Sequence, residues 1–440
     1  MNGSTLSWPG IARLGLVQAA IGMVVVLMTS TLNRVMTVEV GLAATVPGLL
    51  VGLHFAVQAL RPRMGHGSDA GGRRTPWIAG GMLLLVLASV GASAATALLA
   101  TDRVAGLLAA VAAFALIGVG IAASSTPFLA LLAERVAPER RSGAAAMTWI
   151  LMIVGIIATA GVGGALLDPF SYPRLVAVTA GVGAVALLLT AVGLAGAEPA
   201  RRTAAAPAES PQGSFREAFR EVWGEDEARR FAVFIFVSML AYSAQDLILE
   251  PFAGAVFGLT PGESTQVAGM QHGGVLLGMV AGALGARRWG TLSGWAAWGC
   301  AASAAAFLVL AATAFAGSAD AMRAAVFVLG AANGAFAVGA IGAMMGLMHA
   351  GAAGREGLRM GFWGAAQALA YGMGGFAGAA GSDVARWALG SPAAGYAAVF
   401  GVEAALFLAA AAMVARGGAR VRAADVHWGR DGAAALAAAR

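Results

Sequence analysis

The sequence predicts an all-α membrane protein with twelve transmembrane helices arranged as two halves of six. Three observations predict this: a low charge content, twelve apolar segments of spanning length, and arginines concentrated in alternate loops. Of the 440 residues, 59% are hydrophobic and only 11% are charged. A soluble domain carries about 25% charged residues, so this chain lacks the polar surface that water requires. A water-soluble globule is therefore excluded, and a polytopic membrane protein is expected.

The apolar segments follow one another along nearly the whole chain. Each is long enough to cross roughly 30 Å of hydrocarbon, for which about 20 residues are needed. The expected spans are residues 12–37, 44–62, 76–100, 104–132, 144–167, 174–196, 231–256, 265–286, 291–316, 321–349, 358–381 and 393–416.

A change of composition separates the sixth span from the seventh. Residues 197–230 contain three prolines, several charges and no spanning run, so they form a linker between two bundles, 1–196 and 231–416. Residues 417–440 form a polar tail. Within the linker, the sequence from Ser214 to Glu217 fits a capping box, and apolar residues then recur at helical spacing. An amphipathic helix lying on the membrane is expected there, with a solvated tether as the alternative.

Arginine placement predicts the orientation of the spans. With both termini placed in the cytoplasm, 23 of the 28 arginines fall on the cytoplasmic side of the membrane. Cytoplasmic loops of membrane proteins are enriched in basic residues, so this bias indicates cytoplasmic termini. The basic net charge therefore needs no nucleic-acid partner. The single cysteine, Cys300, excludes an internal disulfide and a CxxC metal site.

The loop after the second span carries a glycine and arginine motif. Its distinctive positions are Gly65, Asp69, Gly72, Arg73 and Arg74. Glycines permit a tight turn, and the aspartate can cap a helix or pair with nearby arginines. The motif resembles the signature of the major facilitator superfamily, which has twelve spans in two halves. A phosphate-binding loop is the weaker alternative, since no strand precedes the motif.

Acidic residues lie at membrane depth in the seventh span and in the last. Asp246 and Glu250 are four residues apart and share one helix face, and Pro251 is expected to kink or end that helix. A charge at the centre of a spanning helix costs roughly 2.5–3.5 kcal/mol, so each needs a reason. Glu403, a lone acid in the twelfth span, is expected to serve helix contact.

The first span carries polar residues at a similar depth. Asn33, Arg34 and Glu39 stand near its outer end, and Arg34 can neutralise either Glu39 or Asp246. Two interpretations stay open for Asp246, Glu250 and these three residues together. They form either an ion-pair cluster that holds the two halves together or a site for a proton or ligand.

Histidines within the spans are candidate pigment ligands. A neutral histidine in a helix bundle is usually a hydrogen-bonded core residue, but its imidazole can also ligate the magnesium of a chlorophyll. Gln271 and His272 precede Gly273 and Gly274, whose missing side chains would let a flat macrocycle approach the helix. His272, with Gln271, is therefore the better candidate, and His54 is the second.

The sequence lacks the motifs of several enzyme classes. It has no aspartate-rich NDxxD-type run for magnesium diphosphate, no HExxH sequence, no GxGxxG after a strand and no Walker motif. Catalysis by this chain is not expected, and no intrinsic metal is expected.

Several longer blocks resemble one family, the PucC/LhaA family of phototrophic bacteria. They are Leu32-Asn33-Arg34-Val35-Met36, Gly67-Ser68-Asp69, Arg73-Arg74-Thr75-Pro76-Trp77, and residues 228–231, 245–252 and 256–265. The resemblance spans nearly the whole chain and is strongest to the branch encoded with the late bacteriochlorophyll genes.

The resemblance implies a place in pigment handling. A member of this family is expected in the inner, intracytoplasmic membrane, where it accepts bacteriochlorophyll or a late precursor as cargo. Its expected partners are the lipid bilayer, bacteriochlorophyll synthase and light-harvesting polypeptides. Two alternatives remain open, a non-catalytic subunit of a bacteriochlorophyll synthase complex and a proton-coupled exporter of small molecules.

Overall fold

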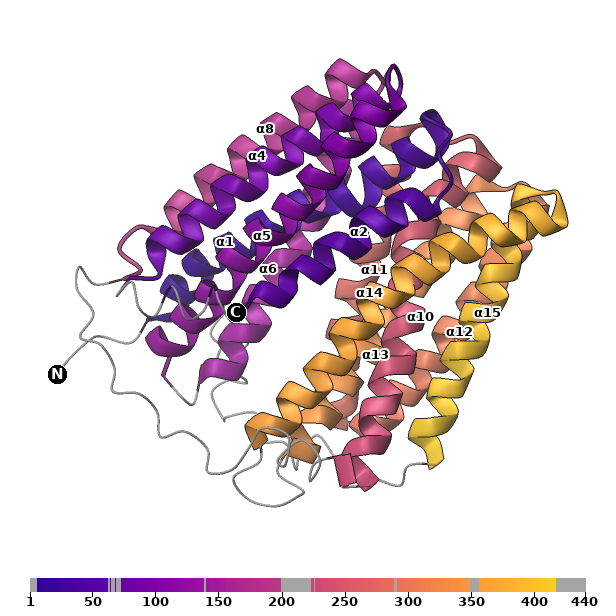
Figure 1. The fold of residues 1–440 in the computed structure, drawn as a ribbon. Helices are drawn as coiled ribbons and strands as arrows, with labels where there is room; N and C mark the ends of the chain where they lie inside the picture. The colour runs from indigo at the N-terminus through magenta and orange to yellow at the C-terminus, as the bar shows by residue number, and fades with distance from the viewer. Residues whose placement is uncertain are drawn as a thin grey trace. The chain divides into compact units, whose positions relative to one another are not determined.

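The computed structural model is helical throughout its regular secondary structure (Figure 1). It describes residues 6–61, 64, 68, 73–137, 140–198, 223–224, 226–288, 291–348 and 356–416. The helices up to residue 194 are α1 (Trp8–Val26), α2 (Thr45–Val57), α4 (Thr75–Leu99), α5 (Arg103–Arg135), α6 (Arg141–Ala158), α7 (Gly164–Leu167) and α8 (Tyr172–Leu194). The later helices are α10 (Asp226–Phe257), α11 (Pro261–Arg288), α12 (Leu292–Ala316), α13 (Ala319–Met348), α14 (Glu356–Leu389) and α15 (Pro392–Arg416).

Short irregular helices extend two of these spans. The π-helical turns η1 (Leu27–Leu32) and η2 (Val35–Glu39) continue α1, and the π turn η5 (Thr159–Gly163) joins α6 to α7. A 3₁₀ turn, η3 (Gln58–Leu60), follows α2. A π turn is wider than an α turn and re-aims the side chains that follow it.

Each of the twelve expected spans corresponds to a helical segment, which confirms the predicted fold class. Among the described residues, ten helices are long and apolar enough to cross a membrane, and α2 is a shorter apolar helix. Large apolar side chains, including Leu87, Leu108 and Trp298, are exposed on these helices. An exposed apolar surface of this kind is suited to hydrocarbon. The chain is therefore a multi-pass membrane protein.

Several helix boundaries differ from the expected ones. α10 begins at Asp226, inside the expected linker, and continues through Pro251 to Phe257, so the proline does not end the helix. Neighbouring helices in a membrane bundle can satisfy the backbone groups that a proline leaves open, which allows the helix to continue. α14 also runs to Leu389, beyond the expected end at residue 381. The expected amphipathic helix and the tail lie outside the described residues.

The chain divides into two compact units. The first contains α1 to α8 together with Leu259–Gly269, and the second contains α10, α12 to α15 and α11 from Met270 onward. The first two turns of α11 thus belong to a different unit from the rest of that helix. The expected division into two bundles separated by a linker did not assign the start of α11 to the first unit.

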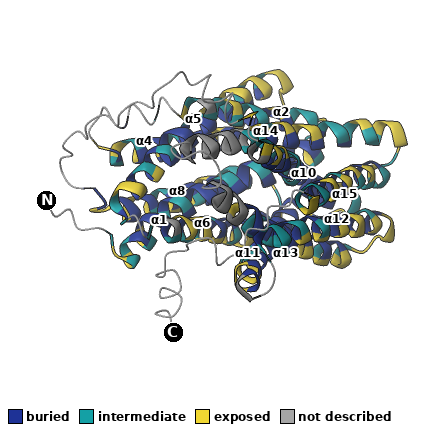
Figure 2. Cartoon of the chain, turned by 90° about the horizontal axis from the view of Figure 1, so that it is seen from below, coloured by how far each residue is buried: buried dark blue, intermediate teal, exposed yellow. Residues whose placement is uncertain are grey.

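In the first unit, α4 packs along α5, and α1 packs against α6 and α8. Small residues allow the helices to approach closely. A Cβ atom on Gly81 would lie 2.6 Å from the backbone nitrogen of Ser124, and one on Gly120 would lie 2.7 Å from that of Leu85. Figure 2 shows buried and exposed residues distributed along the helices, consistent with helices that each bury one side. Close backbone approach through small residues is typical of membrane bundles.

The second unit packs in the same way. α12 lies along α13, where a Cβ atom on Gly299 would overlap the backbone of Phe336. Gly274 of α11 likewise meets the backbone carbonyl oxygen of Phe327 on α13. The expectation that both Gly273 and Gly274 leave room for a flat macrocycle is therefore wrong for Gly274. The space beside Gly274 is filled by a neighbouring helix, and only Gly273 faces open room, with its nearest neighbouring atom 4.0 Å from an added Cβ.

Adjacent alanine substitutions test this assignment of the two glycines. Gly274→Ala should destabilise the protein by about 1–3 kcal/mol, because α11 and α13 must separate to accept the new methyl group. Gly273→Ala should be neutral or stabilising, since alanine is the better helix former. Chemical unfolding of the two variants in detergent measures both effects. Equal destabilisation by the two substitutions would contradict the assignment.

Candidate functional site

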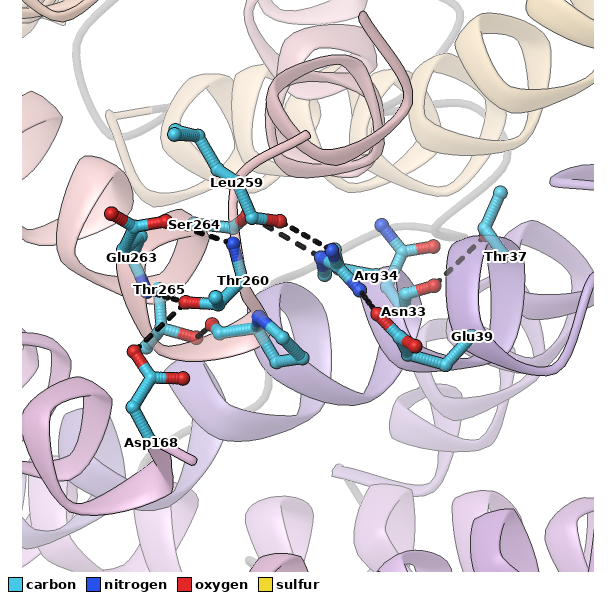
Figure 3. Close-up of polar contacts among 11 residues, drawn as sticks. Asn33, Arg34, Thr37, Glu39, Asp168, Leu259, Thr260, Glu263, Ser264 and Thr265 are labelled. Carbon is cyan, nitrogen blue, oxygen red and sulfur yellow. Dashed lines mark hydrogen bonds and ion pairs between the residues drawn. The ribbon is translucent and has the colours of Figure 1, made fainter. Parts of the chain in front are cut away.

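Arg34 is a buried arginine that links α1 to the start of α11. It stands between the π turns η1 and η2, and its side chain is only 3% exposed. The guanidinium forms an ion pair with Glu39. It also donates to the carbonyl oxygen of Leu259 at 2.5 Å and to the hydroxyl of Ser264 at 3.3 Å (Figure 3). The planar guanidinium suits this geometry, because its several N–H groups diverge toward different acceptors.

Further contacts hold the same segment of α11. The hydroxyls of Thr31 and Thr265 lie 2.9 Å apart, and Thr260 donates its hydroxyl proton to the carboxylate of Asp168 at 2.8 Å. Gly262 lies so close to Asp168 that an added Cβ atom would overlap its carboxylate. These residues, with Arg34, Glu39, Leu259 and Ser264, are called the α1–α11 cluster below.

The α11 segment is shaped for this docking by its own sequence. The backbone N–H of Thr260 donates to the Glu263 carboxylate at 2.9 Å, and the N–H of Glu263 donates to the Thr260 hydroxyl at 3.1 Å. This reciprocal pair is a capping box, which fixes where the helix begins. Gly258, with a φ of 68°, lets the chain reverse after α10. The carbonyl of Leu259 is thereby presented to Arg34.

The loop motif is anchored through Arg74. Its guanidinium pairs with Glu134 at the end of α5, with an Nη2–Oε1 distance of 2.6 Å. Its backbone N–H, and the N–H and hydroxyl of Thr75, donate to the Glu198 carboxylate at 2.8–2.9 Å. A carboxylate at the start of α4 satisfies N–H groups that have no partner within the helix. Arg73 is exposed. Gly65, Asp69 and Gly72 lie outside the described residues.

The acidic residues of α10 belong to the second unit. Glu250 is buried, whereas Asp246 is half-buried beside Tyr242, whose ring centroid lies 6.0 Å from that of Tyr371 on α14. Arg34 and Glu39 form their ion pair in the first unit, where Asn33 precedes Arg34 between η1 and η2, and Asp246 and Glu250 belong to the second unit.

A buried amide network adjoins Asp246. Asn333 of α13 donates to the side-chain oxygen of Gln245 at 3.1 Å and accepts from the Ser303 hydroxyl at 2.9 Å. All three side chains are fully buried, and they join α10, α12 and α13. Polar side chains at membrane depth usually bond across helices in this way.

The two described histidines of the spans differ in access. His54 is 1% exposed, its Nδ1 lies 2.5 Å from the carbonyl oxygen of Val51, and its ring packs on Phe55. A pigment cannot reach this imidazole without movement of α2 or α5, so its geometry favours a core role. His272 is half-buried, and Gln271 beside it is buried. Of the two, His272 is the more exposed residue. His349 lies outside the described residues.

Within the described part of the chain, no group of three or more histidine, cysteine, aspartate or glutamate side chains is arranged to hold a metal ion.

Known proteins resemble this chain over most of its length. A family model described as PUCC protein matches residues 31–420. The "Bacteriochlorophyll synthase 44.5 kDa chain" of Rhodobacter capsulatus is 48% identical over 424 residues, covering 95% of this chain and 98% of that relative. Protein PucC of Rhodovulum sulfidophilum is 28% identical over 382 residues, covering 83% of each protein.

Solved structures share the fold at low sequence identity. A bacterial homolog of the human lysosomal transporter Spinster, in an inward-facing and occupied conformation, gives a TM-score of 0.70 at 15% identity. The match covers 94% of this chain and 98% of that one. Together with the twelve helical spans, it shows the major facilitator fold that the loop motif predicted.

Sequence reasoning missed most partners of the site residues. Leu259 contributes a backbone oxygen, which no side-chain pattern reveals, and Glu134 and Glu198 are distant in sequence from Arg74. One signal was readable. Thr260 and Glu263 stand three residues apart in a capping-box pattern before an apolar run, which marks a helix start at Pro261.

Substitution of Arg34 tests the α1–α11 cluster. Arg34→Ala should lower the free energy of unfolding by on the order of 2–3 kcal/mol, because it removes charge-assisted hydrogen bonds and leaves buried acceptors unpaired. Arg34→Lys should recover only part of this, since an ammonium cannot reproduce the diverging guanidinium donors. Chemical unfolding in detergent measures the differences, with Arg103→Ala as an exposed control. An Arg34→Ala protein as stable as the control would refute the role assigned to the cluster.

Proposed function

The chain belongs to the PucC family, and from that premise we propose that it delivers bacteriochlorophyll, or a late precursor, to light-harvesting polypeptides. The pigment is cargo in this proposal, and the chain itself catalyses no reaction. The protein works in the intracytoplasmic membrane of a phototrophic bacterium with both termini in the cytoplasm, where the arginine bias puts them. Bacteriochlorophyll synthase and the antenna polypeptides are its proposed partners.

Three lines of observation support this proposal. The 48% identical relative carries bacteriochlorophyll synthase in its name, which ties that relative to the pigment. The fold is shared with transporters, which move molecules rather than transform them. The helices are also poor in charge and rich in glycine, a composition that suits a large apolar cargo better than a sugar or an ion.

His272 is the proposed axial ligand of the pigment. Its half-buried imidazole and the open space beside Gly273 are the observations that carry this assignment. A pigment ring approaching α11 from the side of Gly273 would meet the ring edge of Phe327, 4.0 Å from an added Cβ atom, while Gly274 is closed by the backbone of α13. The residues fit one magnesium-bound macrocycle through one imidazole nitrogen.

The absorption spectrum of the gently purified protein tests this function. The wild-type protein should retain bacteriochlorophyll, and His272→Ala should lose most of it or shift its long-wavelength band, because the axial ligand is gone. Gln271→Ala should have a smaller effect. His54→Ala is the matched control, since the packed imidazole of His54 should leave the spectrum unchanged even where stability falls. Purified protein without pigment, or equal pigment in all variants, would count against the proposal.

Two other functions make different predictions. A non-catalytic synthase subunit would be needed for pigment esterification itself, so purified synthase would be inactive without it. An exporter would carry a soluble solute along a pH gradient and lose this in Asp246→Asn. The second alternative has one structural feature in its favour, the half-buried carboxyl of Asp246 at membrane depth.

A further inference from the structure

Glu403 is an acid sealed inside the second unit. It lies on the buried face of α15 between Phe400 and Phe407, and the ring of Phe307 packs on both phenylalanines at 5.8 Å. The residue is 2% exposed. Neither carboxyl oxygen has a hydrogen-bond partner among the described residues. An ionised carboxylate without partners in such a place is very unfavourable, so the group must carry a proton or bind one readily.

Ring contacts place Asp246 at the same depth. Phe252 of α10 packs on both Tyr396 and Phe400, at 5.5 and 4.9 Å between centroids. The seventh and twelfth spans run in opposite directions, and six residues of α10 rise about 9 Å. Asp246 lies six residues before Phe252 on α10. Because α15 runs the other way, the residue at the same depth lies about six positions after the Tyr396–Phe400 level, which is close to Glu403.

An unpaired donor lies close to this level. Gln245 precedes Asp246 and is fully buried, with its side-chain oxygen occupied by Asn333. Its side-chain nitrogen has no acceptor in the described part of the chain. At this depth the side-chain N–H of Gln245 therefore has no acceptor, and the carboxyl of Glu403 has no donor. Both residues are at least nine-tenths buried. Polar groups left unsatisfied on both sides point to a bound species that is not part of the protein chain.

Access to the two acids is unequal. Asp246 is half-buried, as are Tyr242 and Tyr371, whereas Glu403 lies behind it without exposed surface. A proton entering from outside the unit thus meets Asp246 first. Asp246 is therefore the more exposed acid of the two.

Charged and titratable groups on the packed helices do not neutralise Glu403. α15 packs against α10, α12 and α14. Arg386 of α14 is paired with Asp383 and lies over the Tyr396 ring, about 10 Å along α15 from Glu403. The other such groups at or near this depth are Tyr242, Asp246 and Glu250 on α10, Cys300 on α12 and Tyr371 on α14.

From this arrangement we propose that Asp246 and Glu403 form an exchangeable proton-binding site inside the second unit. A hydronium ion gives its proton to the Asp246 carboxylate and leaves as water. The proton then passes to Glu403, directly or through a water that also accepts from Gln245, and Asp246 returns to its carboxylate form. One proton is bound and no bond other than O–H changes. The site goes beyond pigment delivery, since it would couple the protein to proton concentration whatever its cargo.

Infrared spectroscopy of the full chain in lipid vesicles tests the site. Wild-type protein should show the C=O band of a buried protonated carboxyl at neutral pH, and the band should disappear when the pH is raised. Glu403→Gln should abolish this band while the protein stays folded, because the neutral amide imitates the protonated acid. Asp246→Asn should keep the band but change its frequency or its pH midpoint. Asp320→Asn, at an exposed acid of α13, is the control and should change nothing.

Three outcomes would overturn the proposal. They are a wild-type protein without the band at neutral pH, a band that survives in Glu403→Gln, and loss of the band when sodium or potassium ions are added at constant pH, which would indicate a cation site. The pigment spectrum of Glu403→Gln separates this test from that of the proposed function. Pigment retained while the band is lost would leave pigment delivery intact and confirm a separate proton site.

Discussion

The buried guanidinium of Arg34 is the interaction on which the first unit depends. A buried charge is tolerated only when it is paired and hydrogen-bonded, and each of the three guanidinium nitrogens has an acceptor, in Glu39, the Leu259 carbonyl and Ser264. The requirement explains the local structure around it. The π turns of α1 aim Thr31 and Arg34 at the same segment, and the capping box of Thr260 and Glu263 holds that segment in a defined conformation. As a result, the first two turns of α11 belong to the first unit.

The two units treat polar groups in contrasting ways. In the first, Arg34 and Arg74 each bind several acceptors from distant parts of the chain, so the charges are matched and the contacts are structural. In the second, neither carboxyl oxygen of Glu403 on α15 has a hydrogen-bond partner among the described residues. Matched charges hold a fold together, whereas an unmatched buried acid is retained at a cost and marks a functional position. This contrast supports the proton site proposed for the second unit.

The sequence predicted the features that depend on composition and chain length. The spans were readable because about 20 apolar residues are needed to cross the hydrocarbon. The Arg34–Glu39 pair was one of two expected alternatives for Arg34, and it was readable because the two residues are five apart in the sequence. Contacts made through the backbone or between distant residues could not be predicted. Examples are the bond from Arg34 to the Leu259 carbonyl and the bonds from Arg74 to Glu198. The glycines of α11 show a further limit. A glycine in the sequence predicts space beside a helix, but only the packing shows whether a ligand or a neighbouring helix occupies that space. At Gly274 the neighbouring helix α13 occupies it.

Membership of the PucC family, a transporter-like fold and the half-buried His272 support the proposal that the protein moves pigment without altering it. The most direct test distinguishes synthesis of the pigment from its placement in the antenna. It uses a phototrophic bacterium from which the gene for this protein has been deleted. Esterified bacteriochlorophyll and antenna-bound bacteriochlorophyll are both quantified in its membranes. The account predicts that esterified pigment still forms while the antenna-bound fraction falls. Absence of the esterified pigment, or normal amounts of both, would contradict it.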